Sequence, residues 1–98
     1  MNNIEHKEFI LSKVELLKAI AHPIRLCLIQ RLCENERCNV TFFTNCMDAS
    51  QSNISQHLGK LKDLGILGSE KEGQAVYYFI KNEEVRKIVE FILGCENE

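Results

Sequence analysis

The most informative segment of the chain is SQSNISQHLGKLKDLGIL, residues 50–67. Its apolar side chains Ile54, Leu58 and Leu61 recur at i, i+4 and i+7, the spacing of one buried helix face. The opposite face carries mainly hydroxyl and amide groups, whereas a merely solvated helix is usually rich in Glu and Lys. Hydroxyl and amide groups donate and accept hydrogen bonds at short range, as contact with base edges in DNA requires. The segment therefore predicts a DNA-recognition helix.

The start of this helix and its charges also suit DNA. Ser50 can cap the helix, which leaves backbone N–H groups of the first turn available to a phosphate. The chain has a formal net charge of −2, but its acidic residues concentrate near the two ends, and Lys60 and Lys62 make this segment locally basic. We expect non-specific DNA binding to be weak and sensitive to salt. The predicted DNA contacts are Ser50, Gln51, Ser52, Asn53, Ser55, Gln56, His57 and Lys60.

Length and composition limit the class of protein. Ninety-eight residues suffice for one domain with a modest core, and no linker or repeat divides residues 1–98. No apolar run approaches the roughly 20 residues that span a bilayer, and no signal peptide is visible. Five cysteines, an odd number, fit a reducing compartment better than a disulfide scaffold. We expect a cytoplasmic protein with no membrane partner. No catalytic motif is present, so no enzyme is predicted.

Helical periodicity predicts three more helices before residue 50. The first covers roughly residues 4–20, where Ile10, Val14 and Leu17 have helical spacing. Pro23 suits the first turn of a second helix, residues 24–33. A third helix covers about residues 40–47, and the short turn after it completes a helix-turn-helix. The side chains expected to face inward from the second and third helices are Leu26, Ile29, Cys33, Val40, Phe43 and Met47.

The last third of the chain predicts a β-hairpin and a final helix. Gly65 is well placed to end the recognition helix in a left-handed conformation. Residues 66–70 and 75–80 are expected to form two strands around a turn at residues 71–74, which makes a wing. Asn82 can cap a last helix with a strongly apolar stripe. That stripe consists of Val85, Ile88, Val89, Ile92 and Leu93.

The expected fold is mostly α-helical with a small β-hairpin. It is a winged helix-turn-helix of five helices and a two-stranded wing, in the order helix, helix, helix, helix, strand, strand, helix. The first and last helices carry more apolar surface than one small core buries, and a homodimer through these terminal helices would cover it. Such a dimer would place two recognition helices about 34–36 Å apart and select an inverted-repeat operator in double-stranded DNA.

The sequence resembles the ArsR/SmtB family of winged-helix repressors over roughly residues 15–95. The motifs that carry the resemblance are LKAIAHPIRL (17–26), SQSNISQHL (50–58), LGIL (64–67) and GQAVYY (73–78). The resemblance implies a homodimeric repressor that leaves its operator when an effector binds. Gln51, Ser52, Ser55 and Gln56 match the family's DNA-contacting positions. The matching wing tip, residues 71–74, adds Lys71 and Gln74 to the predicted contacts. His22 is expected to have a structural role at a helix start.

The resemblance also implies two metal sites, which this chain matches poorly. In one, two thiolates of the third helix bind soft metals or arsenite, but the nearest stretch, CNVT (38–41), has Cys38 alone. The other lies in the last helix, across the dimer, and the matching positions are Asn82, Glu84, Cys95 and Glu98. Asn, Glu and Cys replace the family's Asp and His residues there, which weakens a zinc site. No cofactor is predicted beyond this metal ion or metalloid.

A third implied sensor uses thiol chemistry without a metal, and we favour it over a metal or metalloid. Relatives that sense persulfide or oxidants pair a cysteine of the second helix with one near the end of the last. Cys27 and Cys33 lie on the second helix here, and Cys95 lies near the terminus, although Cys27 is about one helical turn from the family's position, Gln30. A disulfide requires Cα atoms within about 7 Å.

Other readings of the cysteines and of the chain stay open. Cys38 and Cys46, flanking Phe42 along one edge of the third helix, are a further candidate pair. The cysteines can also be simple core residues, because free Cys is often buried. The chain would then be a regulator without a small-molecule effector. A protein-interaction module on the same scaffold is a further alternative.

Overall fold

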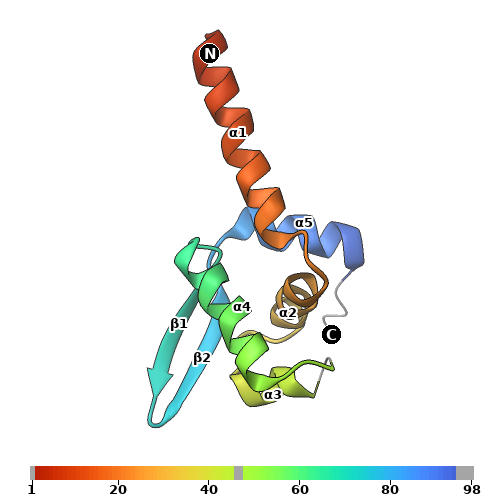
Figure 1. Cartoon of the computed structure of the whole chain (residues 1–98), viewed down its shortest axis with the longest axis vertical. Coiled ribbons are helices and arrows are strands. Elements are labelled where there is room, and N and C mark those ends of the chain that lie inside the picture. Colours follow the sequence, from red (N-terminus) through yellow and green to blue (C-terminus); the bar gives the residue numbers. More distant parts are fainter. Residues whose placement is uncertain (1, 46–47, 95–98) are drawn as a thin grey trace.

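Five helices and two strands follow one another in the expected order within residues 2–45 and 48–94, the part of the chain that this computed structural model describes. Their bounds are α1 Asn3–Ile20, α2 Pro23–Glu34, α3 Val40–Thr44, α4 Gln51–Asp63, β1 Leu67–Glu72, β2 Ala75–Ile80 and α5 Glu83–Leu93. The antiparallel β1–β2 hairpin forms the wing (Figure 1). The prediction of a winged helix-turn-helix is therefore confirmed.

The core lies where α2, α4, α5 and the base of the wing meet. Leu28, Leu58 and Val85 come from the three helices and are almost or fully inaccessible to solvent. Ile66 and Ile80 close the core from the base of the wing. Full burial of an aliphatic side chain contributes roughly 1.5–3 kcal/mol, so this cluster holds α4 in place beneath its exposed face.

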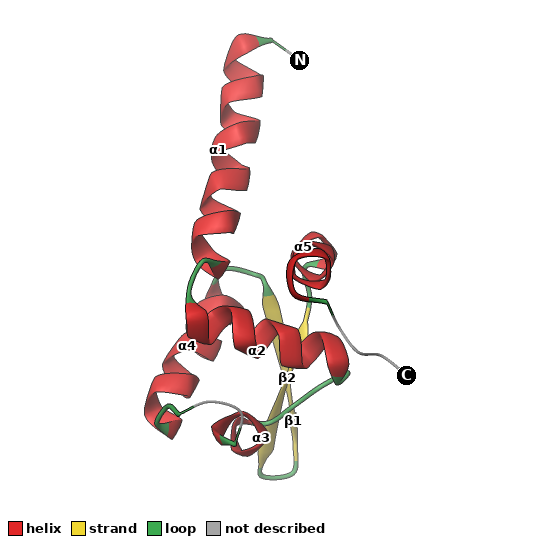
Figure 2. Cartoon of the chain, turned by 90° about the vertical axis from the view of Figure 1, so that its right-hand side faces the viewer, coloured by secondary structure: helices red, strands yellow, loops and turns green. Residues whose placement is uncertain are grey.

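Helix α1 projects away from this core as a long single helix (Figures 1 and 2). Asn2 caps it, with the Asn2 side chain accepting a hydrogen bond from the backbone N–H of Glu5. Among its described residues only Ala19 and Ile20 are buried. Its exposed large apolar side chains are Ile4, Phe9, Ile10, Leu11 and Leu17. The structure thus shows the unburied apolar surface that the sequence predicts for the first helix.

The expected inner faces of α2 and α3 need correction. Leu28 and Leu32 of α2 are buried, whereas Leu26 is only partly buried and packs at the edge of the core. Helix α2 contacts both α4 and α5, so its buried face is centred on Leu28, Ile29, Leu32 and Cys33, and Leu26 lies at its margin. Helix α3 ends at Thr44, earlier than expected. Phe43 is buried as predicted, and Met47 lies outside the described residues.

The wing is longer and its turn tighter than predicted. Strand β1 continues to Glu72, which pairs with Ala75, so the turn consists of Gly73 and Gln74. Gly73 has a φ of 64°, the left-handed conformation that two-residue hairpin turns require. Lys71 therefore lies in β1, opposite Val76, and not in the turn.

Gly65 and the Asn82 cap confirm the expected helix boundaries, and Gly68 explains how the wing packs. Gly65 has a φ of 77° just after α4, as predicted. The side chain of Asn82 caps α5 by accepting a hydrogen bond from the Val85 N–H at 3.1 Å. A Cβ atom at Gly68 would lie 2.5 Å from the Phe79 ring, so this glycine lets Phe79 pack flat across the wing.

In residues 2–45 and 48–94 no helix combines the length and apolar character needed to cross a membrane.

Candidate nucleic-acid interface

Helix α4 carries the predicted recognition face. Ser50 caps it by accepting a hydrogen bond from the Asn53 N–H at 3.1 Å. Ile54, Leu58 and Leu61 are fully buried, which turns the opposite face outward. The side chains exposed there are Gln51, Ser52, Ser55, Gln56 and Lys60, while Asn53 and His57 are partly buried. The helix thus presents short hydrogen-bonding groups to solvent on a rigid support.

The wing tip and the starts of α3 and α4 lie at one end of the molecule, opposite the free end of α1 (Figures 1 and 2). A groove of about 420 Å³ separates them, and it brings Gln51 of α4 and Gln74 of the wing turn into one site. The other lining residues are Asn39, Val40, Thr41, Ala75 and Val76. Two of the predicted contacts, far apart in sequence, therefore share one surface.

Arg37, in the loop between α2 and α3, anchors the wing. Its guanidinium donates to the Glu70 carboxylate at 2.9 Å and also to Glu72, two residues further along β1. The same guanidinium lies 4.3 Å from the centre of the Tyr77 ring on β2. The hydrogen bonds to Glu72 and Glu70 raise the pKa of Arg37. Arg37 thus contacts both strands and offsets part of the negative charge of the two carboxylates on β1.

Backbone pairing joins the same loop to the wing. The Cys38 N–H donates to the Tyr78 carbonyl at 3.0 Å, and the Tyr78 N–H donates back at 2.8 Å. Cys38 is buried and precedes α3. Cys38 thus lies just before α3 and not on it, and Cys46 is outside the described residues, so the pairing of the two stays a prediction.

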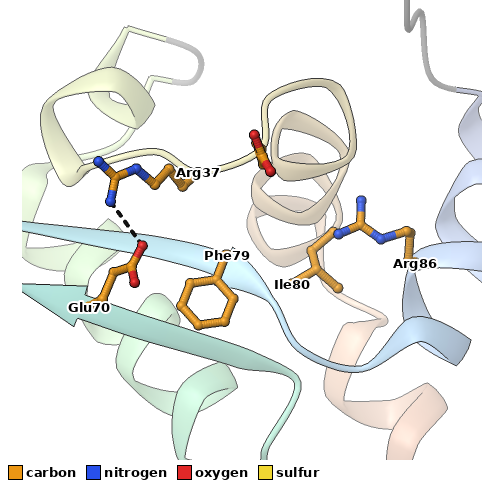
Figure 3. A pocket seen from close by; sticks show the side chains of 6 residues that line it. Arg37, Glu70, Phe79, Ile80 and Arg86 are labelled. Carbon is orange, nitrogen blue, oxygen red and sulfur yellow. Dashed lines mark hydrogen bonds and ion pairs between the residues drawn. The ribbon is translucent and has the colours of Figure 1, made fainter.

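A cavity of about 330 Å³ opens beside Arg37, between the wing, the end of α2 and α5 (Figure 3). Its lining residues are Glu36, Arg37, Glu70, Phe79, Ile80 and Arg86. Both of its arginines are paired with carboxylates. Arg37 pairs with Glu70 and Glu72, and Arg86 forms an ion pair with Glu83 at 3.2 Å. The cavity therefore offers no unbalanced positive charge to an anion.

His57 points from α4 toward α2. Its Nδ1 accepts a hydrogen bond from Arg25 Nε at 3.1 Å, and its ring lies 4.4 Å from the ring of His22. Burial, His22 and Arg25 lower the pKa of His57. His22 in turn caps α2 by accepting from the Ile24 N–H at 3.1 Å, which confirms its structural role. A contact between His57 and DNA stays a prediction.

Two of the predicted sensor residues, Cys27 and Cys33, lie on α2. Cys27 is partly buried and Cys33 is buried. Gln30, at the family's cysteine position, donates to the Gly94 carbonyl at 3.2 Å and links α2 to the end of α5. Cys95 lies outside the described residues. The pairing of a cysteine on α2 with Cys95 stays a prediction.

Two residues of the implied metal site in the last helix, Glu84 and Asn82, already have other partners. Glu84 forms an ion pair with Lys13 of α1 at 2.7 Å, and Asn82 caps α5. Cys95 and Glu98 lie outside the described residues. Within residues 2–45 and 48–94, no three His, Cys, Asp or Glu side chains gather as a metal site.

Sequence reasoning missed Arg25 and Arg37. The alternation of Glu70 and Glu72 on one face of the wing was a signal for a cationic partner, but nothing in the sequence said which cation reaches it. Arg25 stands one helical turn after His22, yet its contact with His57 depends on how α2 crosses α4. Both arginines act between elements, which periodicity within one element does not reveal.

These features define a class of protein. A capped helix with an exposed polar face, a short helix before it and a wing beside it make a winged helix-turn-helix DNA-binding protein. Residues 22–69 match the family model "Bacterial regulatory protein, arsR family". The chain belongs to the ArsR family, and it is a DNA-binding transcription regulator and not an enzyme.

Similar proteins support this assignment. The transcriptional repressor PagR of Bacillus anthracis is 36% identical over 78 residues, which cover 80% of this chain and 78% of PagR. The transcriptional activator HlyU of Vibrio cholerae is 35% identical over 98 residues, covering 98% of this chain and 90% of HlyU. The crystal structure of a predicted DNA-binding regulator from E. coli superposes with a TM-score of 0.85 at 30% identity, over 93% of this chain and 96% of that one.

Proposed function

We propose that the protein is a repressor that binds an inverted-repeat operator as a homodimer, with α4 in the major groove. The observation that carries the proposal is the contrast between the two faces of α4. Ile54 and Leu58 are fully buried, while Ser55 and Gln56 between them are exposed. Amide and hydroxyl side chains on a fixed helix can discriminate base edges in the major groove.

The apolar surfaces of the terminal helices support the dimer. On α5 the side chain of Phe91 is 91% exposed, and Ile92 and Leu93 beside it are also exposed. The apolar side chains along α1 are exposed as well, and Lys13–Glu84 ties α1 to α5. A second copy that covers these surfaces would bring two recognition helices onto one face of the duplex.

The test is DNA binding by the full chain at moderate salt. Binding to the DNA upstream of its own coding region is compared with binding to a scrambled duplex of the same length and composition. We expect preference for the upstream DNA, a footprint over an inverted repeat, and two protomers per duplex. Equal affinity for both duplexes would reject sequence-specific regulation and favour the protein-interaction module.

The direction of regulation needs its own measurement, since PagR is named a repressor and HlyU an activator. We expect transcription in vitro from the bound promoter to fall as protein is added, because an operator that overlaps the promoter excludes the polymerase. A rise in transcript would contradict repression while leaving DNA recognition intact.

The effector proposed for release is a thiol-reactive species acting on Cys27 or Cys33 together with Cys95. Support comes from the partial burial of Cys27 on α2 and from Gln30, whose hydrogen bond shows that α2 meets the end of α5. DNA binding is measured with reduced protein, then after a persulfide or peroxide, and separately with Zn²⁺ or arsenite. Release by persulfide or peroxide supports the proposal, and release only by a metal or metalloid contradicts it. If no treatment releases DNA, the protein is a regulator without such an effector.

A further inference from the structure

We propose that the groove between α2 and α4 binds a backbone phosphate of DNA, and that Arg25 is the residue that holds it. The inference rests on the proposed function, because this groove borders the recognition face. It adds a contact from α2, outside the helix-turn-helix and the wing.

The groove continues the recognition face. It has a volume of about 470 Å³, and its lining residues are Arg25, Ser55, Gln56, His57, Gly59, Lys60 and Asp63. Ser55 and Gln56 are also predicted base contacts, so a duplex seated on them would bring its sugar-phosphate edge toward the groove. Most hydrogen bonds in protein–DNA interfaces go to such edges and fix the register of the protein.

Arg25 is held in a defined orientation within the groove. Its Nε donates to His57 Nδ1 at 3.1 Å, and its Nη1 donates to the Ala19 carbonyl at 2.9 Å. These two acceptors belong to α4 and α1, so three helices fix one guanidinium. The remaining N–H groups of Arg25 have no partner among the described residues. A planar guanidinium with oriented free N–H groups is well suited to a phosphate.

The charges around the groove also favour an anion. Lys60 is exposed on the same side and adds a second cation, while Asp63 at the end of α4 is the one carboxylate among the lining residues. His57 accepts a hydrogen bond from Arg25, which requires an unprotonated Nδ1. Its pKa is lowered by burial, His22 and Arg25, so the neutral form that orients Arg25 prevails at neutral pH.

Gly59 keeps the groove open. It lies on the second half of α4 between His57 and Lys60, and a Cβ atom built on it would meet nothing within 4 Å. A side chain can therefore be introduced there without a clash. This makes position 59 a probe of the groove that does not disturb the core.

The first experiment removes the charge of Arg25. The salt dependence of binding to operator and scrambled DNA is measured for the full chain and for the variants Arg25→Gln and Arg25→Lys. We expect Arg25→Gln to weaken binding to both duplexes by a similar factor, on the order of tenfold, and to reduce the slope of log K against log salt by about 0.9. Arg25→Lys should recover the slope in part. An unchanged slope in a folded Arg25→Gln protein overturns the proposal.

The second experiment leaves Arg25 in place. Gly59→Glu and Gly59→Gln are compared, because the two side chains have the same size and differ in charge. The matched pair Lys62→Glu and Lys62→Gln reports the general effect of a negative charge on the same helix outside the groove. We expect the Glu variant to bind several-fold more weakly than the Gln variant at position 59, and a smaller difference at position 62. Equal differences at the two positions would contradict a phosphate in the groove.

The outcomes separate this proposal from the proposed function. If the protein prefers operator DNA but the variants at positions 25 and 59 bind DNA as the unaltered protein does, the phosphate site is rejected and the proposed regulatory function stands. Failure of the unaltered protein to bind any DNA rejects both.

Discussion

The exposed side chains of α4 are of two kinds. Some can form sequence-specific contacts with bases, and others can contact only the phosphate backbone. Ser55 and Gln56 are short and exposed above buried neighbours, so their positions are fixed by the core. Lys60 is long and exposed, so in the proposed complex its charge would attract any phosphate regardless of sequence.

We expect substitutions in the two groups of side chains to change DNA affinity in different ways. Gln56→Ala should reduce discrimination at one base pair by about 1–3 kcal/mol and leave the fold intact. Lys60→Ala should weaken binding to all sequences and flatten the salt dependence. Competition assays with a set of single-base operator variants measure both. Uniform loss for Gln56→Ala would show that its side chain contacts backbone instead of a base.

The His57 side chain makes stability depend on pH. Because its pKa is lowered in the folded protein, the unfolded chain binds a proton more readily than the folded one. The contribution of neutral His57 to the free energy of unfolding is therefore complete above the ordinary histidine pKa of about 6.5. This contribution is lost as the pH falls below that value. Thermal unfolding between pH 7.5 and 5.5, compared for the unaltered chain and His57→Gln, tests this. A steeper loss of stability in His57→Gln would contradict it.

At the level of elements, the wing shows what local sequence could and could not predict. The strands and Gly73 were recognisable, because alternation and turn residues act within a few positions. The sequence pattern predicts a turn that begins too early, at Lys71, whereas in the structure Glu72 pairs with Ala75 in the strand and with Arg37 of the α2–α3 loop. The long-range backbone pairing of Cys38 with Tyr78 had no local signal in the sequence.

The helices show the same division. Ser50, Asn82 and Gly65 were assigned correctly as caps and stops, because capping depends on neighbouring residues alone. The inner face of α2 was only partly predicted, since it depends on how many neighbours pack on that helix. The polar face of α4 followed from its amphipathic pattern, but the contribution of Arg25 to the same surface needed the three-dimensional arrangement.

Arg37 is expected to act on DNA binding through the wing. Arg37→Ala should weaken DNA binding while changing the stability of the fold little, because exposed ion pairs contribute little to stability. In the Arg37→Ala background, Lys71→Ala should then have a smaller effect on affinity than in the unaltered chain, since the wing is no longer held in place. A double-mutant cycle on operator binding measures this coupling. Full additivity would show that Arg37 does not position Lys71.

Replacing Gly68 or Gly59 by alanine is expected to change the free energy of unfolding in opposite directions. Gly68→Ala forces its Cβ against the Phe79 ring, so we expect a loss of about 1–3 kcal/mol. Gly59→Ala meets no neighbour and removes a flexible residue from a helix interior, so we expect a gain of roughly 0.5–1 kcal/mol. Urea unfolding of both variants supplies the test. A neutral Gly68→Ala would mean that Phe79 moves away at little cost.

For the assembly of the protein, the unburied apolar surface of α1 and α5 is the feature on which the proposed homodimer rests. Phe91→Glu places a charge on the most exposed apolar side chain of α5, and we expect a shift from dimer to monomer together with a large loss of operator affinity. Lys87→Glu, exposed on the same helix, is the control for charge alone. Sedimentation at several concentrations and operator binding measure the outcome. A Phe91→Glu protein that stays dimeric would place the contact elsewhere.

The projecting α1 has a mechanical consequence. A helix of 18 residues is about 27 Å long, so a tilt of about 10° at its base displaces its tip by about 5 Å. The base is tied to Arg25 through the Ala19 carbonyl, and Arg25 touches α4. In the proposed homodimer, a small rotation of α1 beside α4 would therefore produce a larger displacement of the partner protomer that packs on its far end.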